Sequence, residues 1–204
     1  MTIYIEFVSR RPGVSLEGFQ AIVGPAHRNW TAAYPQDRLV LNIARTWRLG
    51  PGPEYLAVWD VPGSGLDRLG EWESMIADPE ARHLEDVFSA VAQIDVAGVY
   101  QPFFDTTSGT GPLYYAEFFD WGPGANSAAV ARFFAERRER HADLVLNMAA
   151  DRFGMLGPDP RGVAVWQSPS YAALEGIARE LDQASLPISL VRAGLYAEIG
   201  TEVV

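Results

Sequence analysis

Three histidines have side chains whose ordinary pKa lies near neutral pH, and two of them are candidates for acid–base chemistry. His27 is expected near the end of a helix that faces a sheet, where its imidazole could move a proton. His83 lies in a segment that the second half of the chain lacks, which is typical of a lid or a pocket wall. Both also have structural interpretations, because His27 could satisfy a core hydrogen bond and His83 could be a surface residue. His141 follows a basic cluster and is interpreted as structural.

Glu6 is a carboxylate that could act beside His27. It lies inside the first expected strand, and Glu117 has the matching place in the second half. A buried glutamate needs a partner. The arginines that could supply one are Arg45, Arg48 and Arg152. A glutamate next to His27 would also orient the imidazole.

Aromatic residues are concentrated in the first half, as is typical of a small-molecule pocket. Asn42 ends an apolar run and could direct its amide to a ligand carbonyl or join two strands. The expected substrate-binding residues are Asn42, Trp30, Trp47, Tyr55, Trp59 and Glu6. Bulky aromatic side chains are equally explained as core. A shift of the strand register by one residue would replace Tyr4 and Glu6 by Ile3 and Ile5 on the pocket face.

An internal duplication must position these residues. The segment LVLN begins at Leu39 and again at Leu144, and AVW begins at Ala57 and again at Ala164. Two copies are too few for a repeat array, so two half-barrels are the expected product. The chain is divided into a first repeat (1–104), a linker (105–112) and a second repeat (113–204).

Each copy shows the order β-α-β-β-α-β, which is the ferredoxin-like unit of an α+β fold. Gly24-Pro25 predicts a kink or a break in the first helix. A further helix is expected after Asp78-Pro79. The expected strands are Ile3–Val8, Leu39–Trp47, Tyr55–Asp60, Ile94–Gln101, Tyr114–Phe119, Leu144–Phe153, Val163–Gln167 and Val191–Ile199. The other helices are expected over 16–33, from about Leu66, over 127–142 and over 170–181.

Composition limits the function. The formal net charge is −10, which argues against nucleic acid as a partner. The cluster Arg137-Arg138-Glu139-Arg140 is interpreted as a solvated helix face. No cysteine is present and no two histidines are spaced i, i+4, so no metal site is expected. The start of the chain does not resemble a signal peptide and no run is long enough to span a membrane, so a cytoplasmic protein without membrane contact is expected.

The duplicated element order resembles a single-chain, tandem version of the dimeric α+β barrel superfamily. The first half is similar to its EthD-like branch, through the segment from Arg10 to Phe19, the histidine at 27 and the LVLN segment. Two ferredoxin-like repeats would then pack sheet to sheet as a pseudo-dimeric barrel. The second half has no histidine at the point that matches His27, so such a site would exist once in each chain.

The resemblance implies lyase, isomerase, dehydratase or cyclase chemistry on a small hydrophobic or aromatic substrate, or less readily oxygenation. We expect no cofactor, with His27 moving a proton. The first alternative is a non-catalytic binding or stress-associated protein whose barrel is filled by side chains. The second is a haem protein, because some relatives bind haem through a helix histidine, here His27 or His141. A homodimer is possible, and the expected partner is a small hydrophobic molecule.

Overall fold

The computed structural model describes residues 2–46, 50–61, 66–75, 77–180 and 186–199 and has an α+β fold. The first half contains β1 (Thr2–Arg10), α1 (Leu16–Ala33), β2 (Arg38–Arg45), β3 (Tyr55–Val61), α2 (Leu66–Met75), α3 (Pro79–Ser89) and β4 (Ala92–Pro102). The second half contains β5 (Leu113–Trp121), α4 (Ser127–Arg140), β6 (Val145–Arg152), β7 (Gly162–Ser168), α5 (Tyr171–Glu180) and β8 (Ile188–Glu198).

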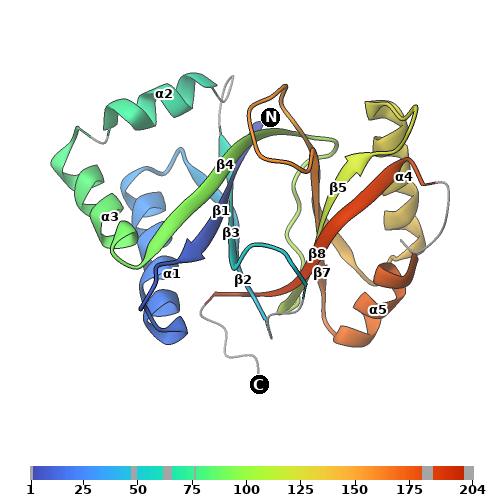
Figure 1. Cartoon of the computed structure of the whole chain (residues 1–204), viewed down its shortest axis with the longest axis horizontal. Coiled ribbons are helices and arrows are strands. Elements are labelled where there is room, and N and C mark those ends of the chain that lie inside the picture. Colours follow the sequence, from blue (N-terminus) through green and yellow to red (C-terminus); the bar gives the residue numbers. More distant parts are fainter. Residues whose placement is uncertain (1, 47–49, 62–65, 76, 181–185, 200–204) are drawn as a thin grey trace.

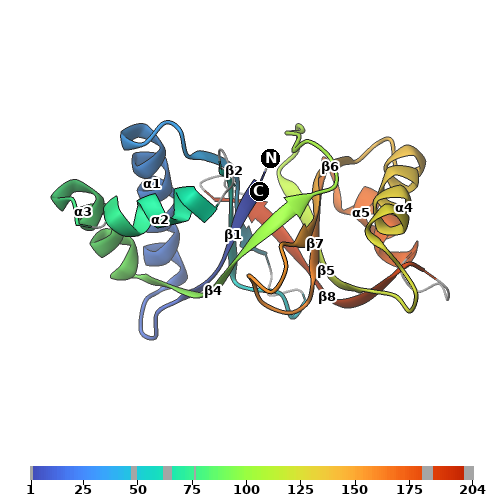
Figure 2. The same ribbon diagram turned by 90° about the horizontal axis from the view of Figure 1, so that it is seen from above.

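The eight strands form one closed antiparallel barrel in the order β1-β3-β2-β8-β5-β7-β6-β4. Each half contributes a four-stranded sheet in which its first and third strands are central. The halves join where β2 pairs with β8 and where β4 pairs with β6. The expected pair of ferredoxin-like repeats, closed as a pseudo-dimeric barrel, is therefore confirmed. The helices of the two halves lie on opposite outer sides of the barrel (Figures 1 and 2).

Alternation along the strands divides the core into three clusters. On β1, Ile3, Ile5 and Phe7 point into the barrel and pack in its central cluster. Tyr4 and Val8 point the other way and pack beneath the helices of the first half. A third cluster lies beneath α4 and α5. The register thus places the outer face of β1, including Glu6, against the helices.

α1 begins as its sequence predicts, because the side chain of Ser15 accepts a hydrogen bond from the backbone N–H of Gly18. It then continues as one helix through Pro25, so the expected break does not occur. α3 begins at Pro79 with Asp78 as its N-cap, as expected. None of the helices in the described ranges is long and apolar enough to cross a bilayer.

The helices that follow the third strand differ between the halves. The first half has both α2 and α3 between β3 and β4, whereas α5 is the helix described between β7 and β8. α3 packs beside α1, and α2 lies above both in the view of Figure 1. Residues of these three helices and of the outer face of the sheet line a common cavity.

Candidate functional site

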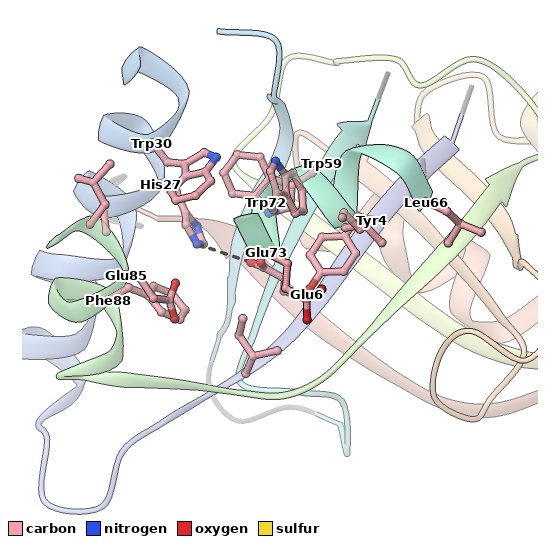
Figure 3. Close-up of a pocket in the computed structure, with 15 residues that line it drawn as sticks. Tyr4, Glu6, His27, Trp30, Trp59, Leu66, Trp72, Glu73, Glu85 and Phe88 are labelled. Atoms are coloured by element: carbon pink, nitrogen blue, oxygen red, sulfur yellow. Dashed lines mark ion pairs between the residues drawn. The ribbon is translucent and has the colours of Figure 1, made fainter. Parts of the chain in front are cut away.

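A cavity of about 640 Å³ lies between α1, α2, α3 and the outer face of the first sheet. It is outside the barrel, whose interior is filled by side chains. Figure 3 shows the labelled side chains from β1, β3 and the three helices converging on it. Its lining residues are Tyr4, Glu6, Ala26, His27, Trp30, Trp59, Leu66, Leu69, Gly70, Trp72, Glu73, Leu84, Glu85, Phe88 and Ile94.

His27 and Glu6 form the polar centre of this cavity. The Nε2 atom of His27 lies 3.6 Å from Oε2 of Glu6 (Figure 3). Both side chains are largely buried, with exposed fractions of 8% and 12%. Glu6 Oε2 has no hydrogen-bond partner among the described residues. Nε2 of His27 and Oε2 of Glu6, either of which can hold a proton, therefore face the cavity together.

The other edge of the imidazole is held by two polar groups. The hydroxyl of Tyr55 lies 2.7 Å from Nδ1, and Oδ1 of Asn42 lies 3.2 Å from the same nitrogen. The ring stacks on Phe88 and meets Trp59 edge to face, each with a centroid separation of 5.2 Å. These contacts fix the ring so that Nε2 points to Glu6 and the cavity.

Burial pushes both members of the pair toward their neutral forms. It raises the pKa of Glu6 from 4.5 to about 7 and lowers the pKa of His27 from 6.5 to about 4. At neutral pH, His27 is therefore uncharged, and Glu6 is the member of the pair that gains or loses a proton.

A buried carboxylate holds the roof of the cavity in place. Asp37 is fully buried and accepts hydrogen bonds from the indole N–H groups of Trp30, at 3.0 Å, and Trp72, at 2.7 Å. Arg68 of α2 donates two further hydrogen bonds to it. Asp37 thus ties α2 to the end of α1 and orients two aromatic walls.

The second half shows what happens when the same place is filled. Arg137 is fully buried and donates to both oxygens of Glu117, at 2.8 and 3.0 Å. The indole of Trp166 donates to the same carboxylate. Arg137 lies eleven residues after the N-cap of α4, and Ala26 lies eleven residues after the N-cap of α1. Glu117 and Glu6 each lie nine residues before the same caps. Ala26 therefore leaves open the space that an arginine occupies in the other half.

These contacts correct two expectations. Arg137 does not belong to a solvated helix face, because the low-dielectric core is where a carboxylate needs a guanidinium most. Two of the three expected partners of the glutamates were also wrong. Arg45 donates to backbone carbonyls of its own turn, and Arg152 pairs with Asp159. Arg48 lies outside the described residues.

The two halves also differ in side-chain size at a second pair of matching positions. Val8 pairs with Tyr55 across β1 and β3, whereas the matching pair in the second half is Phe119 and Gly162. A β-carbon at Gly162 would lie 2.2 Å from the ring of Phe119, so that ring fills the space. In the first half the smaller side chain of Val8 leaves room for the ring of Tyr55. The hydroxyl of Tyr55 lies within hydrogen-bond distance of His27.

The structure brings together most of the residues that the sequence singled out. Trp30 and Trp59 line the cavity, whereas Asn42 and Tyr55 contact His27 from behind and do not line it. His83 is exposed and lies outside the lining, so it does not join the site. Trp47 lies outside the described residues.

Sequence reasoning missed Ala26, Asp37 and the lining carboxylates Glu73 and Glu85. Comparing the two halves position by position would have found Ala26, because it matches an arginine. Asp37 has no counterpart in the duplicated segments, and no motif marks it. His141 donates a hydrogen bond from Nε2 to Oε2 of Glu180 at 3.1 Å, away from this cavity.

Comparison with known proteins gives matches at the level of structure. A protein assigned as a chlorite dismutase is 11% identical, with a TM-score of 0.62 and coverage of 97% of this chain and 94% of that chain. A haem-binding protein from Thermus thermophilus is 9% identical, with a TM-score of 0.60 and coverage of 97% and 90%. An anthrone oxidase-like protein is 11% identical, with a TM-score of 0.60 and coverage of 98% and 92%. No family model and no curated protein matches the chain.

These similarities show that the chain has the fold of dimeric α+β barrel proteins, a fold that includes enzymes and haem-binding proteins. They also overturn the expectation that no cofactor is involved, because haem binders are among the structures with this fold. The similarity to the EthD-like branch stays a prediction.

Proposed function

We propose that the protein is an enzyme that moves a proton on a small hydrophobic or aromatic molecule, as lyases, isomerases, dehydratases and cyclases do. One observation carries this proposal. The Glu6–His27 pair lies in an aromatic cavity, while the corresponding glutamate of the other half is neutralised by Arg137. A buried carboxylate without a cation partner destabilises the folded protein, so its presence indicates a functional role.

Glu6 is the proton acceptor in this proposal. Its pKa of about 7 gives both the ionised and the protonated form near neutral pH, which suits a general base that later returns the proton as an acid. The apolar surroundings strengthen the ionised carboxylate as a base, because water does not stabilise its charge.

His27 supports that exchange from Nε2. The sequence suggested His27 as the group that moves the proton, and the low pKa transfers this role to Glu6. Neutral His27 can donate to ionised Glu6 or accept from protonated Glu6, according to which nitrogen carries its hydrogen. Tyr55 and Asn42 are positioning residues, because they touch the imidazole and do not line the cavity.

Haem is the cofactor that the fold implies, and the lining residues of this cavity do not fit it. A haem carries two propionates, and the described lining contains three glutamates and no arginine. The sequence contains no lysine. Iron bound to Nε2 of His27 would also meet the carboxylate of Glu6, which lies 3.6 Å from that nitrogen. An absorption spectrum of the purified protein tests this conclusion, since a Soret band would contradict it.

A carbon acid with a coloured product tests the base directly. 5-Nitrobenzisoxazole is a neutral aromatic compound whose ring C–H proton is removed by a base. The C–H electrons then form the nitrile, and the N–O bond breaks to release a phenolate. We expect turnover about 100-fold faster than with free carboxylate, rising with pH through about 7.

Two matched pairs of variants complete the test. Glu6→Gln should abolish turnover, whereas Glu175→Gln, an exposed glutamate on α5, should leave it unchanged. His27→Ala should lower turnover, and the exposed His83 provides the control variant His83→Ala. Equal rates in wild type and Glu6→Gln would refute the proposal. Binding of the probe without turnover would favour the alternative of a binding protein.

A further inference from the structure

We propose that the cavity binds an organic cation, a compound with an ammonium or guanidinium head on an aromatic or apolar body. This inference rests on the proposed function, because it names the substrate class of the same cavity. Three observations support it: the aromatic walls, the sign of the charges in the lining, and the group that occupies the same place in the second half.

The aromatic walls are arranged around Trp72. The rings of Tyr4, Trp30 and Trp59 have centroids 5.2, 6.4 and 6.4 Å from the Trp72 ring. Their planes meet it at 73°, 88° and 72°, so the rings present faces in several directions rather than one stack. Rings placed in this way attract a cation through their negative faces, as in aromatic cages that bind quaternary ammonium groups.

The lining carries one sign of charge. Glu6 comes from β1, Glu73 from α2 and Glu85 from α3 (Figure 3). The charge of Glu85 reaches the centre of the cavity, because it helps to raise the pKa of both Glu6 and Tyr4. Arg68 of α2 does not line the cavity, and its guanidinium is already bound to Asp37 and Glu71. A ligand cation would thus meet carboxylates that no side chain of the described lining neutralises.

The second half contains such a cation as part of the chain. The guanidinium of Arg137 lies over the rings of Phe133 and Trp166, each 5.2 Å from the ring centroid. It binds Glu117 of β5 and Glu180 of α5, the helix that follows β7. The first half keeps the matching glutamate, Glu6, and the matching tryptophan, Trp59, but has Ala26 in place of the arginine. The ligand supplies the cation that Ala26 does not.

Titration with three soluble aromatic probes distinguishes the charge that the cavity prefers. Benzylguanidinium carries the head group of Arg137, benzylurea is its neutral counterpart of the same shape, and phenylacetate is an anion. Binding is measured by quenching of tryptophan fluorescence and by calorimetry at pH 8. We expect benzylguanidinium to bind at least about tenfold more tightly than benzylurea, with no detectable binding of phenylacetate. Equal or tighter binding of benzylurea or phenylacetate would overturn the inference.

Variants of the two outer glutamates locate the effect. Glu73→Gln and Glu85→Gln should each weaken benzylguanidinium severalfold and leave benzylurea unchanged, whereas Glu175→Gln should change neither. Loss of cation preference in Glu175→Gln, or an undiminished preference in the double variant of Glu73 and Glu85, would contradict the inference.

The outcomes also separate this inference from the proposed function. If 5-nitrobenzisoxazole is converted through Glu6 but benzylguanidinium neither binds nor competes, the base is real and the cation preference is wrong. If benzylguanidinium binds selectively while Glu6→Gln converts the probe as fast as wild type, the cation site stands and the proton-transfer proposal falls.

Discussion

An arginine at position 26 should give the first half a buried ion pair like the Arg137–Glu117 pair of the second half. In Ala26→Arg, the new guanidinium would start from the place in α1 that Arg137 has in α4, with Glu6 in the place of Glu117. The ionised form of Glu6 would gain a partner, and the cavity would lose the space beside Ala26. We expect the pKa of Glu6 to fall from about 7 to below its ordinary value of 4.5.

The magnitude follows from that change in pKa. A fall from about 7 to 4.5 corresponds to about 3 kcal/mol in favour of the ionised carboxylate, at 1.36 kcal/mol for each pKa unit. The pKa is measured by ¹³C NMR of protein labelled at glutamate side-chain carboxyls, with Glu6→Gln used to assign the signal. Turnover of 5-nitrobenzisoxazole should be lost at every pH, because the base is paired and the space is filled.

Ala26→Leu is the matched control, since it fills the same space without charge. Its Glu6 should keep a raised pKa, because added apolar surface increases the cost of ionisation. If Glu6 still titrates near 7 in Ala26→Arg, or if both variants lower its pKa equally, the correspondence between Ala26 and Arg137 is wrong.

Three further predictions concern stability and positioning. The free energy of unfolding of Glu6→Gln, measured with urea, should rise relative to that of wild type by up to about 3 kcal/mol between pH 4 and pH 8. The reason is that the raised pKa of Glu6 makes the wild-type protein lose stability as pH rises from 4.5 to about 7. A difference between the two proteins that stays constant with pH would contradict this. Arg137→Leu should cost about 3–5 kcal/mol, since it leaves Glu117 buried and unpaired, and adding Glu117→Gln should restore most of that loss. Tyr55→Phe should slow turnover of the probe and change the ¹⁵N shifts of the His27 imidazole while the free energy of unfolding falls by only about 1 kcal/mol; unchanged shifts would show that the hydroxyl does not set the imidazole tautomer.

The fold could be predicted because the duplication repeats its signals. The LVLN and AVW segments mark the second and third strands twice, and Ser15 and Asp78 mark helix starts that the structure confirms. Pro25 predicted a kink or a break, and α1 does not break there. A proline costs a helix hydrogen bond, yet tertiary packing of Val23 and Ala26 against the sheet offsets that cost here.

The site was harder to predict, because its decisive feature is a missing side chain. His27 and Glu6 could be selected by their chemistry, but nothing in the type of Ala26 signals a cavity. Arg137 was misjudged for the opposite reason, since its neighbours in sequence are exposed charges while it alone turns inward. The burial of Asp37 depends on Arg68 and two tryptophans that lie close only after folding.

The two seams of the barrel have a consequence for dilution. Among the described residues, β2 joins β8 and β4 joins β6 through three residue pairs each, whereas β1 and β3 share seven. Two separate chains that formed a barrel across such short seams would dissociate as their concentration falls. Here the segment between β4 and β5 keeps each half at a high effective concentration for the other, independent of the amount of protein. A single chain therefore keeps its barrel assembled on dilution, and its first half has an open cavity where its second half is packed with side chains.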